Sequence, residues 1–210
     1  MRLRFAILAA AALAAAAARA QETIPRWSLI GAETVGDGQH AISAEIGWPG
    51  VSLGWTHGVT AYTDVGLRFD VLYAIDDTTH TRFGLGARVP LRAVAVRGDL
   101  ASLFVHFDPG FSAYPSDPSR WGLRLPVGGA VGFQVTPQSR FALSMEIPIT
   151  FVVQPGVSID VGTQFGASYE WFSDRHVLVG FDSRFGPVFH SAGGGSDVGF
   201  VARLVVAYRM

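Results

Sequence analysis

Cysteine and lysine are absent from this chain of 210 residues. The absence of cysteine excludes disulfides, thiol nucleophiles and thiolate-bound metals. The absence of lysine leaves 16 arginines to balance 17 acids, for a net charge of −1. Nucleic-acid binding normally requires a basic surface, so we expect no nucleic-acid partner.

Long apolar runs are confined to the N-terminus. Arg2 and Arg4 precede an apolar stretch from Phe5 to Ala18, and the small-residue pattern Ala18-Arg19-Ala20 follows. This arrangement predicts a secretory signal peptide over residues 1–20, cleaved after Ala20. A membrane anchor is the competing interpretation, but the stretch is rich in alanine and shorter than the roughly 20 residues that a helical span needs. Cleavage would leave 190 residues with 13 arginines and 17 acids, a net charge near −4.

Hydrophobic residues make up 49% of the chain, a high fraction for an exported soluble domain. After the signal peptide, however, no apolar run reaches the roughly 18 residues of a candidate transmembrane helix. Lipid accepts only two spanning structures, helices and closed barrels, because both satisfy their own backbone hydrogen bonds. The distribution therefore favours a barrel.

Apolar residues recur at alternate positions from about residue 41 to the end. The clearest runs are Val65 to Tyr73, Leu103 to Phe107, Phe141 to Phe151 and Val198 to Tyr208. This period is typical of strands with two unlike faces, although the alternation alone does not say which face is buried. We predict an all-β fold: a single antiparallel up-and-down transmembrane β-barrel of about ten strands over residues 41–210. Residues 21–40 would form a periplasmic N-terminal segment.

The connections between these segments alternate in character. Compact polar turns are expected at 58–63, 97–99, 136–140 and 173–176, and the intervening links at 75–81, 112–120, 153–157 and 190–197. Short periplasmic turns that alternate with longer external loops are typical of outer-membrane barrels. Trp48-Pro49-Gly50 is an exception and must form a tight external turn. An even strand number leaves both chain ends on the periplasmic side.

Aromatic residues on the apolar face fall near the two ends of these strands. Such rings favour the two interfaces of a bilayer, which predicts two belts. The external belt would contain Trp48, Tyr73, Phe83, Phe107, Trp121, Phe151, Phe185 and Phe200, and the periplasmic belt Trp55, Phe133, Phe141, Tyr169, Trp171 and Tyr208.

Three prolines interrupt predicted strands: Pro90, Pro126 and Pro148. Proline removes a ladder hydrogen bond, so the registers around these positions stay open. All three fall on the polar face, where a bulge would not expose backbone to lipid.

At this level the chain resembles small outer-membrane β-barrel proteins of Gram-negative bacteria. Thr34 to Gly38 looks like the approach to their first strand, and Gly54 to Thr60 with Asp64 to Leu67 looks like a strand, periplasmic turn and next strand. Leu204, Val206 and Tyr208 resemble the C-terminal signal for barrel insertion, except that Arg209 and Met210 follow. The resemblance implies location in the bacterial outer membrane, contact with its lipid, and insertion by the barrel-insertion machinery. It identifies no subfamily with a known activity and leaves the oligomeric state open.

With the apolar face toward lipid, the other face would carry a network of charges in the lumen. Its predicted members are Glu45, Arg68, Asp70, Arg88, Arg92, His106, Asp108, Arg124, Glu146, Asp160, Glu170, Asp182, Arg184 and Arg203. Opposite charges crowded together should pair, because an unpaired buried charge is costly. Ten strands lie nearer to filled eight-stranded barrels than to wide porins. We therefore expect a mostly occluded lumen in a protein with a structural, narrow-channel or small-molecule transport role.

Two alternatives stay open. An outer-membrane hydrolase could use an Asp and His pair at the external rim to activate water; the candidates are Asp76, Asp77, His80, Asp108, His190 and Asp197. A soluble periplasmic barrel that binds an apolar ligand would turn the apolar face inward. The favoured interpretation is non-enzymatic, with no catalytic residue, cofactor or metal ligand, since the histidines have no metal-site spacing.

Overall fold

The protein is described by a computed structural model that covers residues 26–75, 79–116, 118–154 and 156–210. The predicted signal peptide, residues 1–20, lies outside the described residues. The predicted all-β class is confirmed, because the described residues form strands and turns and contain no helix. Among them, no helix is long and apolar enough to cross a membrane.

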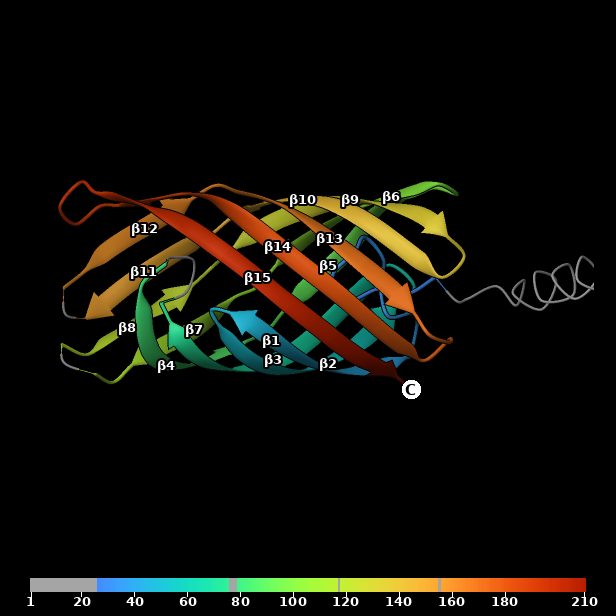
Figure 1. Cartoon of the computed structure of the whole chain (residues 1–210), viewed down its shortest axis with the longest axis horizontal. Coiled ribbons are helices and arrows are strands. Elements are labelled where there is room, and N and C mark those ends of the chain that lie inside the picture. The colour runs from blue at the N-terminus through green and yellow to red at the C-terminus, as the bar shows by residue number, and fades with distance from the viewer. Residues whose placement is uncertain (1–25, 76–78, 117, 155) are drawn as a thin grey trace, which may run out of the picture.

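Fifteen strands form one antiparallel sheet, and they run obliquely to the long axis of the molecule (Figure 1). They are β1 (His40–Trp48), β2 (Gly50–Thr60), β3 (Thr63–Ala74), β4 (Thr81–Arg88), β5 (Leu91–Arg97), β6 (Ala101–Phe107), β7 (Gly110–Tyr114), β8 (Arg120–Arg124), β9 (Val127–Thr136), β10 (Ser139–Ile147), β11 (Ile149–Gln154), β12 (Ser158–Gly162), β13 (Gln164–Phe172), β14 (Val177–His190) and β15 (Ser196–Arg209).

The strand count differs from the predicted ten because several long segments are interrupted. The breaks between β4 and β5, β6 and β7, β8 and β9, β10 and β11, and β12 and β13 are one or two residues long. Four of them contain a proline, which cannot donate to the ladder: Pro90, Pro109, Pro126 and Pro148.

The backbone on both sides of these breaks stays hydrogen-bonded. The carbonyl of Pro109 accepts from Val89 N–H at 2.8 Å, and that of Pro126 accepts from Asp108 N–H at 3.0 Å. The breaks therefore lie beside one another on neighbouring strands. The sheet keeps its hydrogen bonding across this line of breaks.

The pairings link strands that are distant in sequence. β1 pairs with β15, from Ala41 opposite Arg209 to Trp48 opposite Ala202. The two strands at the ends of the sheet order each make one further pairing, β5 with β3 and β12 with β14. The C-terminus and the start of the described chain lie at the same end of the molecule (Figure 1).

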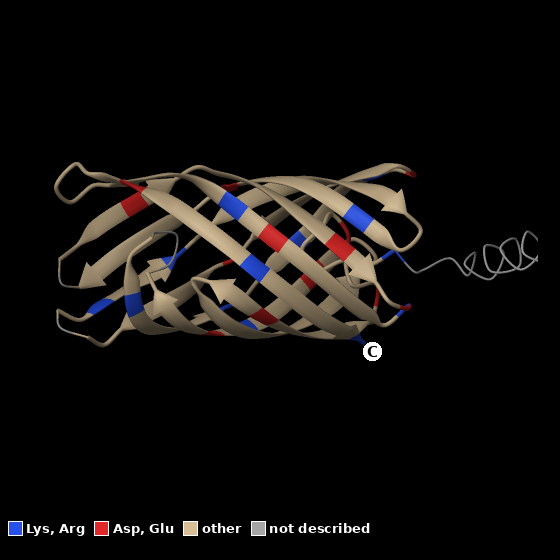
Figure 2. Ribbon diagram, viewed as in Figure 1, with Lys and Arg blue, Asp and Glu red and all other residues tan. Residues whose placement is uncertain are grey.

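Side chains alternate sharply between the two faces of the sheet, and the apolar face is the exposed one. Along β14, Val179, Phe181 and Phe185 are exposed whereas Asp182 and Arg184 are buried. Figure 2 shows the charged positions as bands on strands throughout the sheet. The buried face is therefore polar along the middle of the strands, the reverse of an ordinary soluble core.

Apolar burial is concentrated where the N-terminal residues meet the strands. One cluster joins Trp27 and Val35 to residues of β1, β13, β14 and β15, and a second joins Ala32 to Val94, Phe104, Ala130 and Ala142. Residues 26–39 contain no strand, and those from 27 to 35 are buried or half-buried. The apolar core of this protein thus depends on a segment that has no regular structure.

Candidate functional site

The buried face of the sheet carries a continuous series of ion pairs, which we call the central charge network. It alternates in sign through most of its length and draws on β1, β3, β4, β6, β10, β14 and β15. In the order of contact its members are Asp108, Arg88, Asp70, Arg68, Glu45, Arg203, Asp182, Arg184, Glu146 and His106.

Arginines in this network bridge carboxylates from different strands. Arg203 donates to Glu45 and to Asp182, each at 3.1 Å. Arg184 contacts Glu146 and lies 3.4 Å from Asp182. The planar guanidinium can hold two carboxylates at once, which keeps the buried acids compensated.

The space left inside the network is small. A cavity of about 20 Å³ is lined by Asp70, Arg88, Arg124, Glu146, Arg184 and Arg203 among others. A volume of this size holds about one water molecule. The charged side chains therefore fill the interior at this level.

Residues 27–35, which we call the N-terminal plug, occupy the interior near the chain ends. One oxygen of Glu170 accepts hydrogen bonds from Ser28 Oγ, Leu29 N and Ile30 N at 2.9, 2.9 and 3.0 Å. Arg92 donates to the carbonyls of Leu29 and Ser28 at 2.6 and 3.0 Å. These two strand side chains satisfy backbone groups that would otherwise be buried without partners.

Further contacts fix both ends of the plug. Arg140 donates to the Trp27 carbonyl at 2.8 Å, and the Asp64 carboxylate accepts from Val35 N at 3.2 Å. Within the plug, Glu33 accepts from Arg97 Nε at 2.9 Å and from Ser102 Oγ at 2.7 Å. The plug is therefore held along its whole length.

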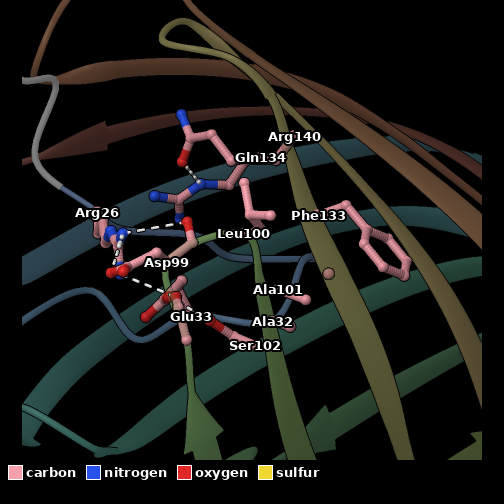
Figure 3. A pocket seen from close by; sticks show the side chains of 12 residues that line it. Arg26, Ala32, Glu33, Asp99, Leu100, Ala101, Ser102, Phe133, Gln134 and Arg140 are labelled. Atoms are coloured by element: carbon pink, nitrogen blue, oxygen red, sulfur yellow. Dashed lines mark hydrogen bonds and ion pairs between the residues drawn. The ribbon is translucent and has the colours of Figure 1, made fainter.

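A small pocket lies beside the plug, with Glu33 and Arg140 on its wall (Figure 3). Arg26 donates to the Gly98 carbonyl at 3.0 Å, and its guanidinium lies 3.6 Å from the exposed carboxylate of Asp99. The pocket measures about 20 Å³, which is again water-sized. It offers no room for an organic substrate.

A third group of charges lies at the opposite end of the sheet, and we call it the rim cluster. His190 Nδ1 is 2.9 Å from Asp160, and its Nε2 is 3.1 Å from Asp197. The same Asp197 oxygen lies 3.1 Å from Nε2 of His80, and Arg120 donates to Asp160 at 2.7 Å. Among the described residues, no group of three or more His, Cys, Asp or Glu side chains is arranged to hold a metal ion.

The structure unites part of the predicted hydrolase set. His80, His190 and Asp197 meet in the rim cluster, whereas Asp108 belongs to the central charge network. Asp76 and Asp77 lie outside the described residues. Both ring nitrogens of His190 contact carboxylates, Nδ1 that of Asp160 and Nε2 that of Asp197, so the two acids fix the orientation of the imidazole.

All fourteen predicted lumen residues are buried or half-buried. Ten form the central charge network, while Arg92 and Glu170 hold the plug, Asp160 joins the rim cluster and Arg124 lines the central cavity. The prediction omitted further charged residues that are buried or half-buried, among them Glu33, Asp64, Arg97, Arg120, Arg140 and Arg209. Asp64, Arg120, Arg140 and Arg209 share the parity of lumen positions on the same strands, so extending the alternation to the strand ends would have found them.

The fourteen predicted belt residues lie on the exposed face, with Trp48 and Phe141 half-buried and the others exposed. Cross-strand neighbours form two aromatic rows. Phe133, Phe141, Tyr169 and Phe181 face one another on β9, β10, β13 and β14, and Phe165, Phe185 and Phe200 on β13, β14 and β15. Phe107, the last residue of β6, lies opposite Leu91 and Val127, beside the line of breaks.

Neither the protein-family models nor the curated proteins gave a match to this chain.

Proposed function

We propose that this protein is an integral β-barrel of the bacterial outer membrane with an occluded, charge-filled interior. The observation that carries the proposal is that the apolar face of the sheet is exposed and its charged face is buried. Phe69 and Leu53 are each 63% exposed, whereas Asp70, the neighbour of Phe69 in sequence, is 5% exposed. Water would penalise such a surface, and a lipid bilayer would favour it.

Closure of the sheet into a barrel is part of the proposal. If each pair of segments separated by a short break counts as one bent strand, the fifteen strands reduce to ten. The pairings β1–β15, β3–β5 and β12–β14 then give every long strand two neighbours. A closed ring has no free edge, which is the condition for a sheet in lipid.

The orientation follows from the connections. β3 ends and β4 begins at the end opposite the chain termini, as do β7 and β8, and β14 and β15, whereas the turns at 61–62, 98–100, 137–138 and 173–176 lie at the terminal end. In the outer membrane the shorter turns would face the periplasm. Export by a signal peptide and insertion by the barrel-insertion machinery complete this proposal.

The role that we propose is structural rather than enzymatic or widely porous. The central charge network and the N-terminal plug occupy the interior at two levels, and the cavities lined by Arg203 and by Glu33 each measure about 20 Å³. A narrow-channel or small-molecule transport role would require both levels to rearrange.

Membrane extraction tests this proposal. The protein should stay with the membrane fraction after osmotic shock, dissolve only in detergent, and change its gel mobility on boiling. Release with the periplasmic contents would support the alternative of a soluble barrel that binds an apolar ligand, and would refute the membrane location.

A surface hydrolase is a second candidate, because the rim cluster brings His80, His190 and Asp197 together. The protein in detergent can be assayed with ester and peptide substrates beside His190→Ala and Asp197→Ala variants. A hydrolysis that both substitutions abolish would favour the enzyme, whereas an activity that neither changes would remove this pair as catalytic residues.

A further inference from the structure

The contacts of the N-terminal plug are unusual because strand side chains recognise mainly its backbone. Eight backbone groups, four of them carbonyls of residues 27–30, contact side chains of the strands. The other four are the N–H groups of Leu29, Ile30 and Val35 and the Val35 carbonyl. The segment itself is a bent loop, closed by a hydrogen bond from Ser28 N–H to the Thr34 carbonyl at 3.2 Å. The strand side chains therefore recognise the backbone of a compact loop.

The strands also leave space shaped for the plug. A side chain at Gly132 would come within 2.7 Å of the Ala32 methyl, and one at Gly180 within 2.7 Å of the Ile30 side chain. Trp27 is fully buried, packs edge-on against Phe172 with ring centroids 5.5 Å apart, and lies under the guanidinium of Arg209. The recess thus has an apolar pocket for an aromatic residue in addition to its polar contacts.

The connection to β1 is a glycine turn. Gly36 and Gly38 have φ angles of 103° and 66°, in the left-handed region that glycine tolerates best. Gly38 N–H donates to the Gly58 carbonyl of β2 at 2.9 Å, so the turn stays anchored to the sheet. The plug before it is held by noncovalent contacts alone.

We propose that the recess formed by Asp64, Arg92, Arg140, Glu170 and Phe172 is a peptide-binding site that the chain fills with its own residues 27–35. The ligand class is a peptide that folds into a compact loop, with an aromatic residue at its first position and mostly small or aliphatic residues after it. When the chain's own segment is displaced, the same site binds an equivalent peptide supplied separately. The inference concerns the interior alone and holds whether or not the protein spans a membrane.

The test uses the full chain in detergent and a fluorescein-labelled peptide of residues 26–36. In the wild type the tethered segment competes at an effective concentration on the millimolar scale, so the added peptide should bind weakly. Trp27→Ala in the chain weakens only the tethered segment, and we expect it to raise the affinity for the added peptide at least tenfold. A Glu170→Gln substitution in that variant should lose most of the gain, because the amide carries no charge and accepts backbone N–H groups less strongly.

A single cysteine at Ala32→Cys reports whether the segment is docked, since the chain has no other cysteine. Its reaction with a maleimide should be at least tenfold slower than that of Asp37→Cys, which is exposed. The rate should rise when Trp27→Ala and Glu170→Gln are added. Heat-dependent gel mobility identifies any variant that has not folded.

Three results would overturn the proposal. The first is equal labelling of the two cysteines in the wild type, which means that the segment is not docked. The second is an Ala32→Cys thiol that stays protected even when Trp27→Ala and Glu170→Gln are present, which means that the segment does not exchange. The third is failure of the added peptide to bind when the chain's own segment is released, or a peptide affinity that Glu170→Gln leaves unchanged.

Discussion

Arg88 on β4 donates two parallel hydrogen bonds to Asp70 on β3, from Nε to Oδ2 at 2.8 Å and from Nη2 to Oδ1 at 2.6 Å. Both residues are at least nine-tenths buried. Arg88 also reaches Asp108 at 3.0 Å, so one guanidinium compensates two acids. Substitution of Arg88 alone therefore deprives two acids, Asp70 and Asp108, of this partner.

Arg88→Met should destabilise the protein by about 3–5 kcal/mol, the usual cost of removing one partner of a buried ion pair. Arg68 Nε lies 3.4 Å from Asp70 and still compensates its charge, so we expect a loss of stability near the lower end of this range. The measurement is the urea midpoint of unfolding, followed by gel mobility without heating. Arg175→Met, in the exposed turn before β14, is the matched control and should change stability by no more than about 0.5 kcal/mol. A double variant, Asp70→Leu with Arg88→Met, should recover part of the loss.

Phe185→Arg tests whether the apolar face meets lipid. Phe185 is 63% exposed and lies between Phe165 and Phe200. An arginine inside the bilayer should cost about 2–4 kcal/mol, falling toward the interfaces. In water the same change at an exposed position should cost no more than about 0.5 kcal/mol. Leu100→Arg, in the turn before β6, is the control and should be neutral in either case. Equal effects of the two substitutions in lipid vesicles would contradict the membrane location.

Asp174 should give the turn between β13 and β14 an acid-sensitive element. Its Oδ1 accepts hydrogen bonds from the N–H groups of His176 and Val177 at 2.6 and 2.9 Å. These bonds hold the pKa of the carboxyl below its ordinary value of 3.8. Because the folded pKa is lowered, the contribution of Asp174 to stability is fully present above that ordinary value and is lost as the pH falls through the folded pKa. Asp174→Asn keeps the acceptor oxygen and should flatten this acid limb in a pH series of urea midpoints, and Asp174→Ala should in addition loosen the turn.

Conductance should require changes at two levels of the interior. The full chain in planar bilayers should be silent, because the central charge network and the N-terminal plug lie in series. Arg203→Ser alone should also be silent, although it leaves Glu45 and Asp182 without this partner. Combined with Trp27→Ala, it should give a small cation-selective current, because the uncovered acids attract cations. Steady large currents from the unmodified chain would refute the occluded interior.

The alternation of residue types was enough to predict the all-β fold and fourteen of the buried or half-buried charged side chains. A period of two fixes the face of every residue once one face is known, so Glu45, Asp70 and Arg203 could be assigned to a common face from sequence alone. The identity of each partner could not be assigned, because it depends on which strands are neighbours. Arg203 contacts Glu45, which lies 158 positions earlier, through the β1–β15 pairing.

The sequence does not predict the burial of the N-terminal plug, for a different reason. Residues 27–35 have neither a helical nor a strand period, and irregular segments usually lie at the surface. Their partners Arg92, Arg140 and Glu170 are between 63 and 142 positions away. The sequence identifies Pro90, Pro126 and Pro148 as obstacles to strand pairing. It does not reveal that the resulting breaks lie side by side on neighbouring strands.

The contact between Glu45 and Arg203 joins the first strand to the last. Glu45 and Asp182 share this one arginine near the C-terminus, so the central charge network is complete only when β15 is paired with β1. A chain that stops before residue 203 leaves two buried acids without this shared partner. The seam between the two termini thus favours full-length molecules and makes correct completion of the sheet a condition of its stability.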